Sequence, residues 1–263
     1  MNYIDLFSGC GGLSLGLERA GFKLALAVEK SDMASETFYH NLIKPLNSNE
    51  EWVKYCSKTI EEQAKSRLVV GELRKVLEND DIMENLAAQD IALIAGGPPC
   101  QGFSLAGRRD PNDLRNQLPW QFLTMVERLE PKAVILENVV GINRRFNKND
   151  KNAPFDKLTE ALELIGKGYV VQPVQLNAMH YGAPQHRPRI MLLALRKDIA
   201  EYANVAGSRI IWNSNFDFSG PTITSINQKP DLAPRGEISY EDCLTVHEAL
   251  WDVGPKGYKF KFN

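Results

Sequence analysis

The sequence predicts an α/β protein built on a doubly wound, mostly parallel sheet with helices on both faces. Two observations support this prediction. Apolar runs of strand length alternate with stretches of helical periodicity along most of the 263 residues. A Gly-rich turn at residues 8–12 separates the first apolar run from the first helical stretch, which is where sheets of this kind bind nucleotides.

The first half of the chain alternates strand and helix in order. Residues 1–7 predict a strand, and the helix predicted at 13–20 ends at Gly21, a residue that commonly ends helices. A strand at 23–29 precedes a helical stretch at 33–41. Residues 43–67 are polar and predicted to be helical, and we treat them as an insertion. Short apolar runs at 67–70 and 91–95 predict two further strands.

The second half continues the alternation and then loses it. The amphipathic stretch 118–129 predicts a helix, and the apolar run 133–137 predicts a strand. A helix at 155–167, closed by Gly168, precedes strands at 169–177 and 189–195. Beyond about residue 199 the pattern loosens. Residues 213–237 are rich in Pro, Gly, Asn and Ser and predict a loop, followed by a short helix at 246–251.

The composition limits the classes of function. A formal net charge of −2 argues against a uniformly basic nucleic-acid coat, although phosphate contacts need only a local basic cleft. Four cysteines without a C-x-x-C pair, and an N-terminus unlike a signal peptide, predict a cytoplasmic protein without disulfides or a metal site. No apolar run is long enough to cross a membrane.

The cysteine at position 100 lies in a run rich in Gly and Pro. The run Gly-Gly-Pro-Pro-Cys-Gln-Gly-Phe-Ser at 96–104 directly follows the apolar stretch 91–95. The two prolines fix the backbone before Cys100, and the glycines allow another group to approach closely. A thiol at the end of a buried strand predicts a nucleophile. The other three cysteines are expected to be small buried hydrophobes.

The Gly-rich turn predicts a nucleoside cofactor. It places backbone N–H groups and a helix N-terminus against a ligand, and Glu29 lies about twenty residues further on, where a carboxylate accepts hydrogen bonds from both ribose hydroxyls. A dinucleotide fingerprint requires Gly or Ala at position 14, and this chain has Ser14. That difference argues against NAD and FAD.

Five separated motifs together resemble the cytosine-5 DNA methyltransferase family, in that family's usual order. They are Phe7-x-Gly9-x-Gly11-Gly12, Glu29, the Gly-Pro-Pro-Cys-Gln-Gly run ending at Gly102, Glu137-Asn138-Val139, and Gln185-His186-Arg187-Pro188-Arg189. The resemblance covers about residues 2–195. It implies the Rossmann-like fold of S-adenosylmethionine-dependent methyltransferases, S-adenosylmethionine as methyl donor, and double-stranded DNA as substrate.

The resemblance implies a role for each matching residue. The implied cofactor contacts are Phe7, Gly9, Gly11 and Gly12 around the methionine part, Glu29 on the ribose, Glu72 where the family usually has Asp near the adenine, and Pro98 and Leu118. Cys100 is implied to add to C6 of cytosine, which activates C5 toward methyl transfer. Glu137 is implied to meet N3 and the exocyclic amine, Arg189 the O2 side, and Arg187 the same pocket or a phosphate.

The implied reaction also requires the target base to leave the duplex. C5 of cytosine is inaccessible inside paired DNA, so the base must be flipped into the pocket. The polar loop after the nucleophile contains Ser104, Arg108 and Arg109, which we expect to contact DNA.

Two parts of the family pattern are missing. We find no segment of the Gly-Asn-Ala-Val type, and too little chain lies between Leu195 and Cys243 for a target-recognition domain. We therefore expect a catalytic and cofactor-binding domain at 1–198 and an irregular C-terminal extension at 199–263. The leading hypothesis is the catalytic subunit of a split restriction-modification methyltransferase, completed by a second polypeptide. The alternatives are a truncated cofactor-binding remnant without turnover and a tRNA cytosine-5 methyltransferase.

Overall fold

The computed structural model describes residues 1–99, 117–143, 153–214, 230–234 and 243. Within those residues, eight strands form one sheet in the order β3-β2-β1-β4-β5-β7-β6-β8. The strands are β1 (Asn2–Leu6), β2 (Lys23–Glu29), β3 (Leu68–Val70), β4 (Ile91–Gly96), β5 (Ala133–Asn138), β6 (Tyr169–Asn177), β7 (Pro188–Arg196) and β8 (Trp212–Asn213). The first five pair in parallel, and β7 runs antiparallel to both of its neighbours, β5 and β6.

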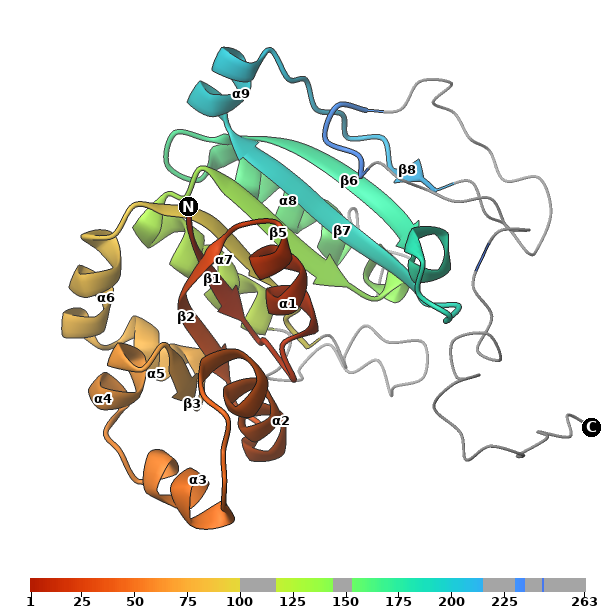
Figure 1. Ribbon diagram of the computed structural model, residues 1–263. Coiled ribbons are helices and arrows are strands. Elements are labelled where there is room, and N and C mark those ends of the chain that lie inside the picture. The colour runs from red at the N-terminus through yellow and green to blue at the C-terminus, as the bar shows by residue number, and fades with distance from the viewer. Residues whose placement is uncertain (100–116, 144–152, 215–229, 235–242, 244–263) are drawn as a thin grey trace, which may run out of the picture.

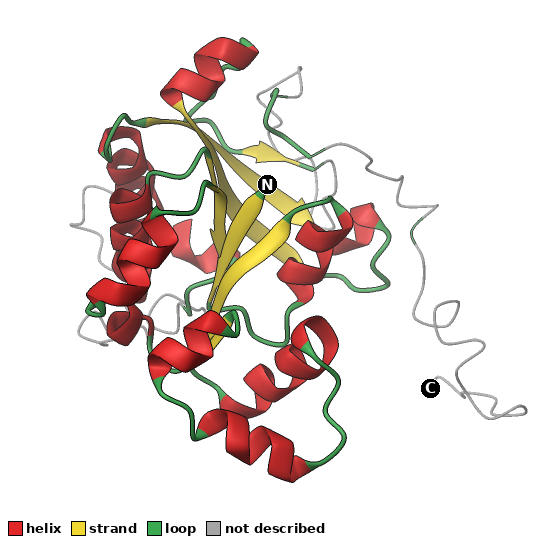
Figure 2. Ribbon diagram, turned by 60° about the vertical axis from the view of Figure 1, so that its left-hand side comes forward, coloured by secondary structure: helices red, strands yellow, loops and turns green. Residues whose placement is uncertain are grey.

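Helices cover both faces of this sheet (Figures 1 and 2). Those of the described residues are α1 (Gly12–Arg19), α2 (Asp32–Phe38), α3 (Asn49–Cys56), α4 (Ile60–Lys65), α5 (Leu73–Leu77), α6 (Asp80–Ala87), α7 (Leu118–Leu129), α8 (Pro154–Leu164) and α9 (Lys197–Ala203). Apolar side chains of α5, α6, α7 and α8 pack into one core cluster with strand residues such as Ile4 and Leu136. A second cluster joins α1, α2 and α3 to strand residues such as Leu93 and Ala95. The predicted doubly wound fold is confirmed.

The apolar patterns placed most elements within two residues of their bounds. β2, α7 and β6 agree with the predicted ranges at both ends. α5, α6 and α9 are absent from the predicted elements, and α9 spans the expected domain boundary at residue 198. Cys100, the loop after it and the predicted helix at 246–251 lie outside the described residues, as does most of the loop predicted at 213–237.

The segment predicted as a polar insertion is helical, but it is also part of the core. It forms α3 and α4, and Trp52 and Tyr55 of α3 are only 3% and 2% exposed. Their rings pack with each other at 5.5 Å and with Tyr39, and the Trp52 indole donates a hydrogen bond to Asp32 at 2.9 Å. These aromatic contacts join the segment to the second core cluster.

Candidate cofactor and active site

One edge of the sheet collects the residues predicted to carry function. Because β1, β2, β4 and β5 are parallel, their last residues lie side by side, with Leu6 opposite Val28 and Gly96, and Gly96 opposite Leu136. β7 runs the other way, so its first residues meet the end of β5 at this same edge. In open α/β sheets this is the edge where ligands bind.

The glycine loop, residues 7–11, leaves β1 through three left-handed positions. Phe7, Gly9 and Gly11 have φ values of 59°, 54° and 90°. A Cβ atom at Gly11 would lie 2.5 Å from Leu42 Cδ1 and 2.9 Å from Phe38 Cδ2. Gly11 is therefore required both for its backbone angle and for the close approach of α2 and the turn after it.

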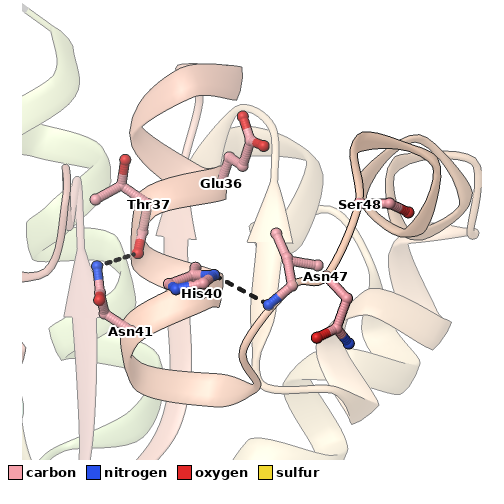
Figure 3. Close-up of a pocket in the computed structure, with 7 residues that line it drawn as sticks. Glu36, Thr37, His40, Asn41, Asn47 and Ser48 are labelled. Carbon is pink, nitrogen blue, oxygen red and sulfur yellow. Dashed lines mark hydrogen bonds between the residues drawn. The ribbon is translucent and has the colours of Figure 1, made fainter.

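That turn is a π-helical segment at Tyr39–Ile43, and it lines a polar pocket on the outer side of α2 (Figure 3). The pocket encloses about 360 Å³, and the His40 ring accepts a hydrogen bond from the backbone of Leu46 at 3.0 Å. None of the predicted site residues lines it. The hydrogen bond from Leu46 to His40 fixes the loop between α2 and α3 beside this pocket.

Glu29, at the end of β2, is held by two backbone groups. Oε2 accepts a hydrogen bond from Gly9 N at 2.9 Å, and Oε1 accepts one from Ser31 N at 2.7 Å. The carboxylate is half-buried. Each oxygen still has a free lone pair, so the group can accept two further hydrogen bonds from a vicinal diol such as a ribose.

The start of α1 leaves further polar groups available beside Glu29. Its N-cap residue is Gly11, which has no side chain to accept a hydrogen bond from the first turn. The first N–H groups of the helix therefore remain open to a ligand. The Ser8 hydroxyl is buried and has no partner among the described residues. A Cβ at Gly12 would meet nothing within 4 Å. These donors, the orphaned hydroxyl and the Glu29 carboxylate fit a nucleoside cofactor with an amino-acid end.

The other expected cofactor contacts lie at or near this edge. Glu72 follows β3 and forms an exposed ion pair with Lys30, Nζ to Oε1 at 2.7 Å, which lowers the pKa of the Glu72 carboxyl. Pro98 is buried just beyond β4, and Leu118 is half-buried at the first position of α7. The Lys30–Glu72 pair thus connects the ends of β2 and β3, next to Glu29.

Glu137 and Arg189 meet directly. Arg189 Nε lies 2.7 Å from Glu137 Oε1, and the two side chains are 21% and 26% exposed. A Cβ at Gly97 would lie 2.8 Å from Glu137 Oε2, so the backbone leading to Cys100 passes against this carboxylate. The buried Asn138 amide donates to the Pro98 carbonyl at 3.1 Å and fixes that backbone to the end of β5.

Arg187 is placed through its backbone. Its N–H donates to Asn177 Oδ1 at 2.9 Å, while its side chain is exposed and makes no ion pair within the described ranges. Arg187 therefore lies two residues before Arg189 in the sequence but makes no ion pair with Glu137. Cys100, Ser104, Arg108 and Arg109 lie outside the described residues.

The sequence motifs did not single out Asp5, Ser14, Asn138 or Asn177 as site residues. Asp5 is 1% exposed, and its Oδ2 accepts a hydrogen bond from Ser14 Oγ at 2.6 Å. Burial raises the pKa of Asp5 to about 7, and the bond from Ser14 opposes that rise. A signal was present in the sequence, because Asp5 is the one charged residue of β1 and lies between apolar neighbours.

Comparison with known proteins identifies the family of this architecture. A family described as C-5 cytosine-specific DNA methylase matches residues 1–50 and 45–256. The Type II methyltransferase M.DdeI of Desulfomicrobium norvegicum is 37% identical over 198 residues, which cover 75% of this chain and 41% of that protein. M.NgoPII of Neisseria gonorrhoeae is 30% identical over 254 residues, covering 96% of this chain and 57% of that protein.

A solved structure shows the same arrangement. A crystal structure described as a prophage-encoded DNA modification methyltransferase of E. coli aligns with a TM-score of 0.59 and 28% identity, covering 95% of this chain and 54% of the other. The chain spans about half the length of the relatives it matches. In the described part of the chain, no helix has the length and apolar character needed to cross a membrane.

Proposed function

Because the chain belongs to the family of C-5 cytosine-specific DNA methylases, we propose that it is the catalytic portion of a DNA (cytosine-5) methyltransferase of the restriction-modification kind. The observation that carries this proposal is the contact of Glu137 with Arg189, against the backbone that leads to Cys100. It supplies a carboxylate and a guanidinium side by side, next to the backbone of Gly97, three residues before Cys100 in the sequence. The family's methyl donor is S-adenosylmethionine.

The proposed chemistry begins with Cys100. Its thiolate forms a bond to C6 of the cytosine, and the electron pair of the C5–C6 double bond moves into the ring. A proton at N3 neutralises the developing charge, and we assign its transfer to Glu137, which takes the proton up from solvent as the base binds. Bound S-adenosylmethionine supplies the electrophilic methyl group that C5 accepts. Loss of the C5 proton to solvent, return of the N3 proton to Glu137 and release of the Cys100 thiolate then restore the aromatic base, and S-adenosylhomocysteine is the second product.

The Glu137–Arg189 pair suits the Watson–Crick edge of a flipped cytosine. The carboxylate can accept from the exocyclic amine and share a proton with N3, while the guanidinium donates to O2. Before the base arrives, each group neutralises the other at a distance of 2.7 Å, so neither charge is left unpaired in a partly buried site. We assign Arg187 to the rim of this pocket, where it is free to contact a phosphate.

We assign the cofactor to the neighbouring half of the edge. Glu29 would accept hydrogen bonds from the ribose hydroxyls, Phe7, Gly9, Gly11 and Gly12 would surround the methionine end, and Glu72, Pro98 and Leu118 would border the adenosine. The two backbone hydrogen bonds to Glu29 and the open N-terminus of α1 support this assignment.

We propose that duplex DNA is the substrate and that a second polypeptide carries target recognition and the missing C-terminal motifs. Ser104, Arg108 and Arg109 would contact the DNA backbone beside the flipped base. The relatives are about twice as long as the portion matched here.

Transfer of labelled methyl groups from S-adenosylmethionine tests the proposal. The purified chain is assayed on duplex DNA and on tRNA, with and without the product of any neighbouring gene. We expect little transfer by the chain alone and transfer to duplex DNA with the partner. Preferred transfer to tRNA would support an RNA methyltransferase, and binding of the cofactor without transfer under any condition would indicate a remnant.

A variant pair tests the nucleophile in the same assay. Cys100→Ser should abolish transfer, because a hydroxyl is far less nucleophilic than a thiolate, while leaving S-adenosylmethionine binding unchanged. Cys56→Ser is the control, since the Cys56 thiol at the end of α3 donates a hydrogen bond to Asp32 of α2 and a hydroxyl can keep that contact. Turnover in Cys100→Ser comparable with that of the control would rule out Cys100 as the nucleophile.

A further inference from the structure

Asp5 is a buried carboxyl group two residues before the glycine loop, and one of its two oxygens has no hydrogen-bond partner among the described residues. It lies between Ile4 and Leu6 in β1, both fully buried, and is itself 1% exposed. Ser14 of α1 donates to its Oδ2 at 2.6 Å. Its Oδ1 is also buried and makes no hydrogen bond within the described residues. A buried carboxylate in this state is costly unless a cation or donor reaches it.

No cation of the described residues is paired with Asp5. The charged group that acts on it most is Glu29 of β2, which has the same sign, and the nearby titratable group on β1 is the Tyr3 hydroxyl. Its partners on the adjacent strands are Ala27 and Ala95, which have no charge. α1 contributes the neutral Ser14. The surroundings therefore favour a protonated, neutral Asp5 as long as no positive charge is close.

The glycine loop, which begins two residues after Asp5, is where the proposed function places the methionine end of the cofactor. S-adenosylmethionine carries a positive sulfonium, whereas the product S-adenosylhomocysteine has an uncharged thioether and is otherwise the same. We propose that Asp5 is the buried counter-charge by which this site prefers S-adenosylmethionine to S-adenosylhomocysteine. The inference rests on the proposed cofactor site and assigns Asp5 a specificity role within it.

The preference should depend on pH, because the sulfonium favours the ionised form of Asp5 and the thioether does not. The ordinary pKa of an aspartate is near 4, and burial raises that of Asp5 to about 7. Between pH 6 and pH 8 its ionised fraction then rises roughly tenfold. The ratio of the two dissociation constants should change in favour of S-adenosylmethionine by the same factor, roughly tenfold, as the binding-competent form becomes dominant.

Titration calorimetry of the chain with each of the two ligands at pH 6, 7 and 8 measures this ratio. Groups common to both ligands cancel in it. We expect a rise of roughly tenfold in the native chain and a constant, low ratio in Asp5→Asn, which keeps an acceptor for Ser14 but no charge. In Ser14→Ala the rise should move to higher pH, because the bond from Ser14 lowers the pKa of Asp5.

Two controls keep the outcomes distinct. Asp90→Asn removes an exposed carboxylate that pairs with Lys132 just before β4, at the opposite edge of the sheet, and should leave the ratio unchanged. Carbon NMR of the Asp5 carboxyl in the native chain needs no variant, and its titration midpoint should fall when S-adenosylmethionine is added but not with S-adenosylhomocysteine. A pH-independent ratio, or the native ratio in Asp5→Asn, would overturn the inference. Failure to bind either ligand would instead refute the proposed cofactor site.

Discussion

Among single residues, the adjacent glycines Gly11 and Gly12 differ in whether the fold can accept a side chain at their position. Gly11 has a left-handed backbone, and a Cβ there would overlap Leu42 and Phe38, whereas Gly12 begins α1 with open space around it. Gly11→Ala should therefore destabilise the protein by about 1 to 3 kcal/mol. Gly12→Ala should be neutral or stabilising by up to about 1 kcal/mol, since alanine favours a helix.

Urea unfolding of the two variants checks this prediction. The substitution is the same in both, so the difference between the two midpoints isolates the backbone angle and the packing at Gly11. Equal stability of the two variants would mean that the loop can relax away from Leu42 and Phe38.

For the site residues, the sequence motifs predicted positions but not contacts. The positions of Glu29, Glu137 and Arg189 at strand ends could be predicted, because each adjoins an apolar run whose length is visible in the sequence. Their partners could not be predicted. The Glu137–Arg189 contact depends on β7 running against β5, and the hydrogen bonds of Glu29 depend on the left-handed turn that returns Gly9 to it.

Among the elements, the short and mostly polar helix α4 connects α3 to β3 through hydrogen bonds. Its first turn forms a capping box, in which Thr59 Oγ1 accepts from Glu62 N and Thr59 N donates to Glu62 Oε2 at 3.0 Å. The helix holds the buried Gln63, whose side chain accepts from Val70 N at 2.9 Å and donates to the carbonyls of Cys56 and Lys58. α4 therefore fastens α3 to β3.

Removing the Thr59 side chain, which caps α4, should lower the stability of the protein. Thr59→Ala should cost about 1 kcal/mol of unfolding free energy, because the N–H of Glu62 loses its acceptor. Thr124→Ala, at an exposed position inside α7, is the matched control and should change stability by less than about 0.5 kcal/mol. Denaturant unfolding measures both, and an equal effect of the two substitutions would contradict a role for the cap.

Elements were predicted well where an apolar pattern was long and poorly where it was short. α7 presents five buried residues over three turns, and its bounds agree with the prediction. α5 has only Leu73 and Val76 on its buried face, and a new N-cap at Asn79 starts α6 immediately afterwards. Two short turns in close succession show no sustained helical period, so their packing could be recognised only in the folded chain.

For the whole molecule, Asp5 makes stability depend on pH in the less common direction. Its pKa is about 7 in the folded protein and near 4 when unfolded, so the folded state keeps a proton that the unfolded state has released. The contribution of Asp5 to stability is therefore complete below pH 4 and is lost as the pH rises to about 7, by up to about 1.4 kcal/mol per pH unit.

Unfolding free energies of the native chain and Asp5→Asn between pH 5 and pH 8 test this dependence. The native chain should lose stability relative to the variant as the pH rises and should level off above pH 7. A constant difference between the two would show that Asp5 is ionised throughout this range in the folded protein.

The position of β7 has a consequence for how the protein is made. β7 is synthesised after β6, yet it lies between β5 and β6 in the sheet. As the chain leaves the ribosome, the outer edge of β5 has no partner until residues 188–196 have emerged, and β6 has no neighbour on that side either. Arg189 reaches Glu137 in the same event that closes this gap. An incomplete nascent chain therefore lacks the Glu137–Arg189 contact.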